Sequence, residues 1–198
     1  MGREEVIGEI KRKSIHLIPG FMAIPVVVWL GNPYATAIAL FFLALYSLHE
    51  LVLRLGLNVD VPIVSHTFRV MARREELEGR YFTGTVYFWA CTTAIVALME
   101  PWRASAAVMV SSFGDAAAAI LGKAFRTPSL PFNPRKTVGG LVAMFLASLA
   151  SCLLARVPLT TSLIVSAAAA AVEGLTRISV LDELTVPITA AVLLHLLP

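Results

Sequence analysis

The sequence has few charged residues: they make up 15% of its 198 residues, whereas hydrophobic residues make up 58%. An ordinary soluble domain carries about 25% charged residues, so this composition excludes one. No separate soluble domain fits between the apolar runs. We therefore expect an integral membrane protein that forms a single domain over residues 1–198.

Cysteine and the familiar nucleotide motifs are also scarce. Cys91 and Cys152 fall inside apolar runs, without the spacing of a zinc site or a disulfide framework. Each is expected to be a small buried side chain. No stretch fits a Walker A loop or GxGxxG, and Lys136-Thr137 lacks the preceding glycine. Any nucleotide site in this chain must therefore be unconventional.

What the sequence has is a series of apolar runs along its whole length. A membrane-spanning helix needs about 20 apolar residues. The pattern indicates seven such segments, of which the last two are short: 15–31, 35–53, 83–99, 102–121, 138–155, 159–172 and 184–197. The expected fold is an all-α polytopic membrane bundle. The polar stretch 54–82 is expected to form an amphipathic helix on the membrane surface, and 122–137 a second polar loop.

Lysine and arginine are distributed unevenly between the two sides of the predicted membrane. With the N-terminus in the cytoplasm, all of them except Arg103 and Arg156 fall on the inner side, as the positive-inside rule requires. The acidic residues gather there too, with Glu100 alone on the outer side. Because the rule concerns only basic residues, the acidic companions indicate a polar site. We expect a multi-pass protein of the cell membrane whose active site faces the cytoplasm.

Asp115 lies inside an apolar run, in the segment SSFGDAAAAILGK at 111–123. An ionised carboxylate at membrane depth is costly, so it is expected to face a cavity, a partner charge or a metal. The small residues around it, Gly114 and 116–119, allow backbones or a ligand to come close. A packing residue paired with an arginine is the alternative. We expect Asp115 to bind magnesium or to accept a substrate proton.

A basic loop stiffened by prolines follows that segment. Its polar residues are Lys123, Arg126, Asn133, Arg135 and Lys136. Thr137 is expected to cap the next helix, whose first turn would leave backbone N–H groups free beside Gly139 and Gly140. Cations at a helix N-terminus form an anion site that suits a triphosphate. The alternative is a topogenic loop that touches lipid headgroups.

Three acidic residues near the C-terminus lie at predicted helix ends. Asp182 and Glu183 precede the last apolar run, where capping of the helix is a sufficient explanation. Glu173 lies at a helix C-terminus and opposes the helix dipole, so it is expected to have a metal or cationic partner. The candidate metal ligands are Asp115, Glu173 and Asp182, and the candidate catalytic residues are Asp115, Lys136 and Asp182.

Further polar residues are candidates for the substrate interface. Glu9, Lys13 and His16 are spaced to share one helix face, although His16 alone is more simply an interfacial histidine. Glu50 and Arg54 are spaced as a local ion pair. The start of the third apolar run adds Arg80, Thr83 and Gly84.

Five segments, taken in order, resemble a known family of membrane enzymes. They are RKSIHLIPG (12–20), EGRYFTGTVYF (78–88), FGDAAAAILGKAF (113–125), LPFNPRKTVGG (130–140) and DELTVP (182–187). They are similar to the polyprenol kinase family, which includes dolichol kinases and phytol kinases. The resemblance implies an enzyme that transfers phosphate, typically from CTP with a divalent cation such as Mg²⁺, to the terminal hydroxyl of an isoprenoid alcohol.

The resemblance also implies roles for individual residues. Asp115 corresponds to a metal-binding or catalytic aspartate, and the small residues after it would leave room for a prenyl chain. The other matching positions are Lys123, Asn133, Lys136 and Thr137 in the nucleotide loop, and Asp182 and Thr185 in a C-terminal polar motif. The chain departs at Gly139, where many dolichol-kinase-like members have Glu, and at Glu183, where Asn is common. The first departure moves it toward the phytol-kinase-like branch.

Two other functions remain open from the sequence. A CTP-dependent lipid cytidylyltransferase would use the same ligands but attack the α-phosphate. In a transporter or lipid-binding protein, Asp115 would bind a coupling ion. The expected partners are a lipid substrate in the membrane and a nucleoside triphosphate, without nucleic acid, and a homo-oligomer is left open.

Overall fold

The computed structural model describes residues 3–57, 59–125 and 127–198, and most of them are helical. Arg126, a predicted cation of the basic loop, lies outside the described residues. The elements in chain order are α1 (Arg3–Ala23), the π-helix η1 (Ile24–Leu30), α2 (Asn32–Arg54), α3 (Val64–Met71), α4 (Arg74–Gly79), α5 (Thr83–Leu98), α6 (Pro101–Met109), the π-helix η2 (Val110–Gly114), α7 (Asp115–Ala124), β1 (Ser129–Leu130), β2 (Asn133–Thr137), α8 (Val138–Leu154), α9 (Leu159–Leu175) and α10 (Ser179–Leu196).

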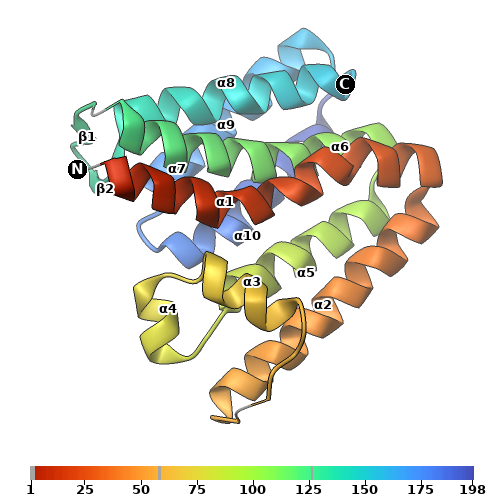
Figure 1. Ribbon diagram of the computed structural model, residues 1–198. Coiled ribbons are helices and arrows are strands. Elements are labelled where there is room, and N and C mark those ends of the chain that lie inside the picture. The colour runs from red at the N-terminus through yellow and green to blue at the C-terminus, as the bar shows by residue number, and fades with distance from the viewer. Residues whose placement is uncertain (1–2, 58, 126) are drawn as a thin grey trace.

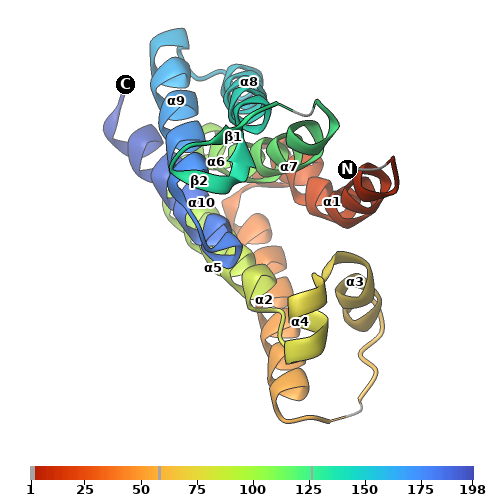
Figure 2. The same ribbon diagram turned by 90° about the vertical axis from the view of Figure 1, so that its left-hand side faces the viewer.

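The helices form two groups that are joined by α10. In the first group, α7 and α9 pack against α8, and α1 packs against α6, η2 and α7. In the second group, α2 and α5 pack together and diverge from α1 (Figure 1). Figure 2 shows α3 and α4 beside the far end of α2, remote from α8 and α9. Because α10 contacts α9, α6 and α5, it lies between the two groups.

Small residues allow the helices around Asp115 to pack closely. A Cβ on Gly140 of α8 would lie 3.0 Å from the carbonyl oxygen of Ala118 on α7. A Cβ on Gly20 of α1 would lie 2.6 Å from the ring of Phe113 in η2. Neither crossing leaves room for a larger side chain. The contact at Ala118 agrees with the expectation that the small residues after Asp115 let backbones approach.

Three helices of the described chain are long and apolar enough to cross a membrane: Val6–Leu30, Asn32–Arg54 and Pro101–Ala124. Shorter apolar helices span Thr83–Leu98, Val138–Leu154 and Leu159–Leu175. Each of the seven predicted segments overlaps a helix, which confirms the helical class. The seven-span topology and the cytoplasmic N-terminus stay predictions.

In place of one amphipathic helix, the described part of 54–82 forms the two short helices α3 and α4. The break falls at Ala72 and Arg73, which are extended. The Glu76 carboxylate accepts a hydrogen bond of 2.7 Å from the backbone N–H of Arg73, and this contact starts the new helix. Arg80 takes the left-handed conformation, with φ 52°, at the end of α4.

The predicted polar loop at 122–137 contains the last residues of α7 and a β-hairpin. β1 and β2 pair antiparallel, with Leu130 opposite Asn133. The side-chain amide of Asn133 donates to the carbonyl oxygens of Gly174 at 2.9 Å and Thr176 at 3.0 Å. These two hydrogen bonds hold the hairpin against the C-terminal end of α9.

The last helix begins earlier than predicted. α10 starts at Ser179, so Asp182 and Glu183 lie within the helix rather than before it. Pro187 therefore lies in the helix interior. The dipole argument still applies to Asp182, which lies in the first turn, where a negative charge is favourable.

Candidate functional site

A polar cavity of about 640 Å³ lies where α1, α7, the hairpin, α9 and α10 meet. Its basic lining residues are Arg12, Arg73, Arg74, Lys123, Arg135, Lys136 and Arg177, and its acidic ones are Glu9, Glu75, Asp115, Glu173 and Asp182. The sequence predicts this gathering of both signs of charge. A cavity of this size accommodates a drug-sized ligand, and its cations favour an anionic one.

Asp115 is the first residue of α7 and forms a buried ion pair with α1. Its carboxylate accepts from the ammonium group of Lys13, whose side chain is only 2% exposed. His16 lies one turn further along the same face of α1, with its Nε2 3.3 Å from Asp115 Oδ2. The Asp115 carboxylate therefore has a partner charge, the Lys13 ammonium, which is one of the three environments expected for it.

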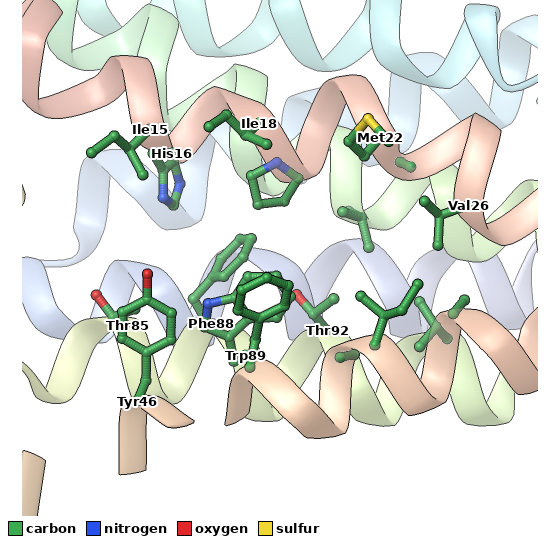
Figure 3. Close-up of a pocket in the computed structure, with 18 of the residues that line it drawn as sticks. Ile15, His16, Ile18, Met22, Val26, Tyr46, Thr85, Phe88, Trp89 and Thr92 are labelled. Carbon is green, nitrogen blue, oxygen red and sulfur yellow. The ribbon is translucent and has the colours of Figure 1, made fainter. Parts of the chain in front are cut away.

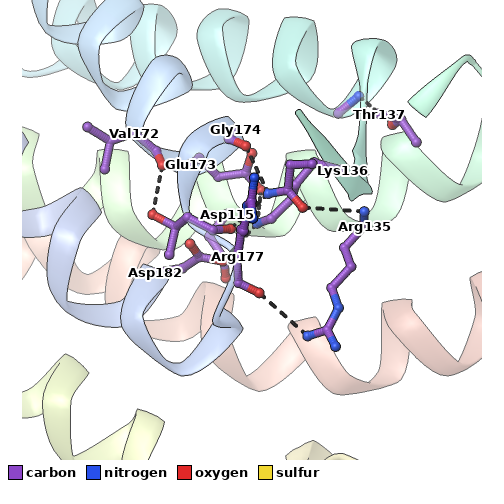
Figure 4. A network of polar contacts seen from close by, with 12 residues as sticks. Asp115, Arg135, Lys136, Thr137, Val172, Glu173, Gly174, Arg177 and Asp182 are labelled. Atoms are coloured by element: carbon purple, nitrogen blue, oxygen red, sulfur yellow. Dashed lines mark hydrogen bonds and ion pairs between the residues drawn. The ribbon is translucent and has the colours of Figure 1, made fainter. Parts of the chain in front are cut away.

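Lys136 of β2 links the hairpin to two helices. Its Nζ lies 2.5 Å from Glu173 Oε1 on α9 and 2.7 Å from Asp182 Oδ2 on α10. Figure 4 draws the three residues within one polar network. Burial alone would lower the pKa of Lys136, but the Glu173 and Asp182 carboxylates outweigh it and raise the pKa above 10.5. The prediction that Glu173 has a cationic or metal partner is confirmed, and the partner is Lys136.

The N-terminus of α8 differs from the free anion site that the sequence predicts. Thr137 caps the helix as expected, because its Oγ1 accepts from the N–H of Gly140 at 3.1 Å. The N–H of Gly139 donates to Thr127 Oγ1 at 2.6 Å, and that of Val138 to the carbonyl oxygen of Pro128 at 3.0 Å. These N–H groups are already engaged, so the expectation that they are free is wrong. An anion in the cavity would instead meet side-chain cations.

The other predicted cations are only partly engaged. Lys123 Nζ lies 2.5 Å from Glu9 Oε2, and Glu9 also pairs with Arg12. Arg135 is exposed and reaches the carbonyl oxygen of Arg177 at 3.5 Å. Because these side chains are open to solvent along one wall of the cavity, they can turn toward a ligand.

An apolar cavity of about 550 Å³ lies between α1, η1, α2 and α5 (Figure 3), and residues of α3 also line it. Polar side chains gather at one end of it, where His16, Tyr46, Thr85 and Glu183 line the wall. The small side chains after Asp115 do not form this space. Ala118 and Ala119 line the polar cavity instead, and the expectation that this face leaves room for a prenyl chain stays a prediction.

His16 joins the two cavities. It lines the apolar cavity, whereas its neighbour Asp115 lines the polar one. The His16 side chain is 5% exposed, and its Nε2 has no hydrogen-bond partner in the part of the chain that the structure describes. Glu183 Oε2 lies 3.7 Å from the same Nε2. The polar end of the apolar cavity therefore touches the carboxylate that borders the charged cavity.

The three predicted metal ligands are divided between two clusters. Glu173 and Asp182 converge on Lys136, whereas Asp115 lies with His16 and Glu183. The ligand atoms of Asp115, His16 and Glu183 lie within 4.8 Å of one another, a spacing compatible with a cation.

The remaining predicted residues lie behind the cavity walls. Glu50 pairs with Arg54 at 2.7 Å and accepts from Thr83 Oγ1 at 2.7 Å, which holds α2 against α5. Gly84 faces Glu183, because a Cβ on it would lie 3.6 Å from Glu183 Cγ. The Thr185 hydroxyl donates to the carbonyl oxygen of Leu181 at 2.9 Å within α10.

Sequence reasoning missed several residues of the site. Lys13 and Glu183 were noted but not placed in it, although the four- and three-residue spacing of Glu9, Lys13 and His16 puts all three on the face of α1 that meets α7. Arg73 and Arg74 come from the segment between α3 and α5, which was expected to lie on the membrane surface. The other additions are Arg12 of α1, Glu75 of α4 and Arg177, which follows α9.

The chain is similar to phytol kinase 1, a chloroplastic protein of Arabidopsis thaliana, with 26% identity over 151 residues. The match covers 73% of this chain and 47% of the relative, so the chain spans about half the length of the curated relative it matches. No family model matches the chain. No solved structure matches it. The similarity indicates a distant relationship to a phytol kinase.

Proposed function

We propose that this protein transfers a phosphate group from a nucleoside triphosphate to the terminal hydroxyl of a membrane isoprenoid alcohol, of dolichol, phytol or geranylgeraniol type. One observation carries the proposal: the contact between His16 and Asp115 joins an apolar cavity to a cavity rich in cations. A kinase for a lipid alcohol needs this arrangement, because its two substrates arrive from different phases. The distant similarity to a phytol kinase supports it.

The donor would lie in the polar cavity, and we propose CTP. Phosphoryl transfer depends on positioning and on neutralising phosphate charge rather than on covalent chemistry. Lys123, Arg135 and Lys136 border the space where the phosphates would lie, and Arg73 and Arg74 line the same cavity. The described walls of this cavity come from six separate helices and a hairpin, which suits a site that sets the position of one phosphate chain.

The carboxylates of the polar cavity fit a magnesium ion. Mg²⁺ prefers oxygen ligands and keeps several waters. Asp182 Oδ1 is buried and has no hydrogen-bond partner among the described residues, and Asp115 lines the same cavity. Each of these side chains offers oxygen ligands from its own cluster, with Glu173 adjacent to Asp182 through Lys136, and a bound ion would screen the phosphate charge. A triphosphate with Mg²⁺ would then occupy a single cavity.

The acceptor hydroxyl would lie at the polar end of the apolar cavity, beside His16. Its oxygen forms a bond to the terminal phosphorus while the bond from that phosphorus to the bridging oxygen breaks, and the nucleoside diphosphate leaves. The alcohol proton passes to His16 Nε2, and Asp115 Oδ2, 3.3 Å away, stabilises the imidazolium. The polar cavity would open to the cytoplasm and the apolar one to the membrane of a multi-pass protein.

The test uses purified protein in detergent with Mg²⁺, geranylgeraniol or dolichol, and CTP, ATP, GTP or UTP in turn. We expect a prenyl monophosphate and a nucleoside diphosphate as products. Pyrophosphate and a CDP-lipid from a prenyl phosphate would indicate a cytidylyltransferase instead. If no nucleotide yields a phosphorylated lipid, while the protein remains monodisperse, the proposal is wrong.

A further inference from the structure

We propose that the apolar cavity binds the hydrocarbon chain of the acceptor and that residues of α2 at its closed end set the longest chain that enters fully. This inference rests on the proposed function. It assigns the cavity to a single linear chain about as long as one lipid tail, with a hydroxyl at the end beside His16.

The lining residues show that the cavity is long and narrow. Along α1 and η1 they run from His16 to Val27, and along α5 from Thr85 to Val96. At a rise of about 1.5 Å per residue, each stretch covers roughly 17 Å. The hydrocarbon part of one leaflet is about 15 Å deep, half of a 30 Å core. A volume of about 550 Å³ spread over such a length is a slot for one chain rather than a chamber for a bulky ring system.

One end of the slot is polar, and the other end is apolar and closed. The polar end carries the buried His16, next to the carboxylate of the polar cavity. At the other end Val27, Ala35 and Val96 are all buried, so the slot is closed there. A chain with one polar terminus therefore has a single favourable direction of binding.

The side of the slot supplies an entrance. Ile18 and Met22 on α1 line it and are about half exposed, and Ile63, just before α3, is 72% exposed. Exposed apolar side chains on helices that are long enough to span a bilayer face lipid rather than water. An alcohol dissolved in the bilayer can thus slide in sideways, without crossing the charged cavity.

Two alanines of α2, Ala35 and Ala39, lie where a larger side chain would limit the length of the bound hydrocarbon chain. Both line the slot, and their side chains are almost fully buried. Counting from Tyr46 at the polar end, Ala39 lies about 10 Å along the helix and Ala35 about 16 Å. A larger side chain at either position would fill the slot at that depth. Substitution at Ala39 should therefore exclude shorter alcohols than substitution at Ala35.

The experiment compares wild type with Ala39→Phe, Ala35→Phe and the control Ala37→Phe, which places the same ring on the exposed face of α2. Each protein is assayed with CTP, Mg²⁺ and geraniol, farnesol or geranylgeraniol. The shift in unfolding temperature that each alcohol causes without nucleotide gives a second readout. Ala39→Leu replaces Ala39→Phe if the latter is not monodisperse.

We expect wild type and Ala37→Phe to prefer geranylgeraniol to geraniol by at least about tenfold in kcat/KM, since each buried methylene adds to binding. The kcat/KM of Ala39→Phe should fall at least about tenfold with geranylgeraniol and stay unchanged with geraniol. The kcat/KM of Ala35→Phe with farnesol should also stay unchanged. The temperature shifts should follow the same order.

The outcomes separate this inference from the proposed function. An unchanged chain-length profile in all four active proteins overturns the slot and leaves the kinase intact. Graded temperature shifts without phosphate transfer support the slot and overturn the kinase. Absence of both transfer and graded shifts overturns both.

Discussion

The polar and apolar cavities are similar in size, about 640 and 550 Å³, but they are built in opposite ways. The polar cavity depends on pairs of charges from distant parts of the chain: Lys13 and Asp115 are 102 positions apart, and Lys136 and Asp182 are 46 apart. The apolar cavity is lined mainly by continuous stretches of α1 with η1, of α2 and of α5. A buried charge needs its partner, whereas an apolar wall needs only volume. Single substitutions should therefore act sharply in the first cavity and gradually in the second.

The largest effect should follow Asp115→Asn. We expect kcat to fall by about a thousandfold, because the amide supplies no negative charge to the cation or to His16. The amide also leaves the buried ammonium of Lys13 without a carboxylate, which should lower the free energy of unfolding by about 3 kcal/mol. Single-turnover phosphate transfer and thermal unfolding in detergent measure the two effects.

The double variant Lys13→Met/Asp115→Asn separates charge pairing from chemistry. It removes both charges, so it should recover most of the lost stability but none of the activity. Substantial turnover in Asp115→Asn would remove this aspartate from the mechanism and make it a packing residue.

A smaller effect is expected from Lys136→Met in the same cavity. The KM for the nucleotide should rise about ten- to a hundredfold, while the KM for the alcohol changes by less than about twofold. The reason is that Lys136 lines the polar cavity and not the apolar one. Steady-state kinetics with each substrate varied in turn measure this split. Arg54→Met, at an exposed cation paired with Glu50, is the control. Equal rises in both constants would indicate that Lys136 serves only the structure.

Gly114→Ala tests how tightly the helix that carries Asp115 is packed. An added Cβ would lie 2.6 Å from Met144 Sδ and 3.0 Å from Ser148 Oγ. Relief of this overlap should cost about 1–3 kcal/mol of unfolding free energy. Gly8→Ala, whose Cβ would have no described atom within 4 Å, should instead stabilise α1 by about 1 kcal/mol. Thermal unfolding of both variants measures the contrast, and equal stabilities would mean that η2 yields to accommodate the methyl group.

The smallest effect concerns pH. Because its carboxylate partners raise the pKa of Lys136, the folded state holds this proton more tightly than the unfolded state. The resulting stabilisation is fully present below pH 10.5 and is lost as the pH rises through the higher pKa of the folded protein. The difference in Tm between wild type and Lys136→Met should shrink above that pH. A difference that stays constant up to pH 12 would contradict the ion pairs.

The sequence predicts features that local patterns encode. Each apolar run produces a helix, Thr137 caps α8, and the unfavourable place of Glu173 at a helix end correctly signals a partner. It does not reveal the Lys13 partner of Asp115, because a pair across 102 positions leaves no local pattern. The sequence does not predict the hairpin either, because Asn133 binds backbone carbonyls, which every residue carries. The apolar cavity is a shape between helices, and composition does not encode it.

The π-helical turn η2 directly precedes Asp115 in the helix that runs from Pro101 to Ala124. A π turn contains more residues than an α turn, so it sets the rotational phase of everything that follows it. If these same five residues formed ordinary α-helix instead, the extra residue of the π turn would swing α7 by about 100° about its axis. The carboxylate would then point away from α1, although hydropathy and length would hardly change. In this span, residue count is as strict a requirement as residue type.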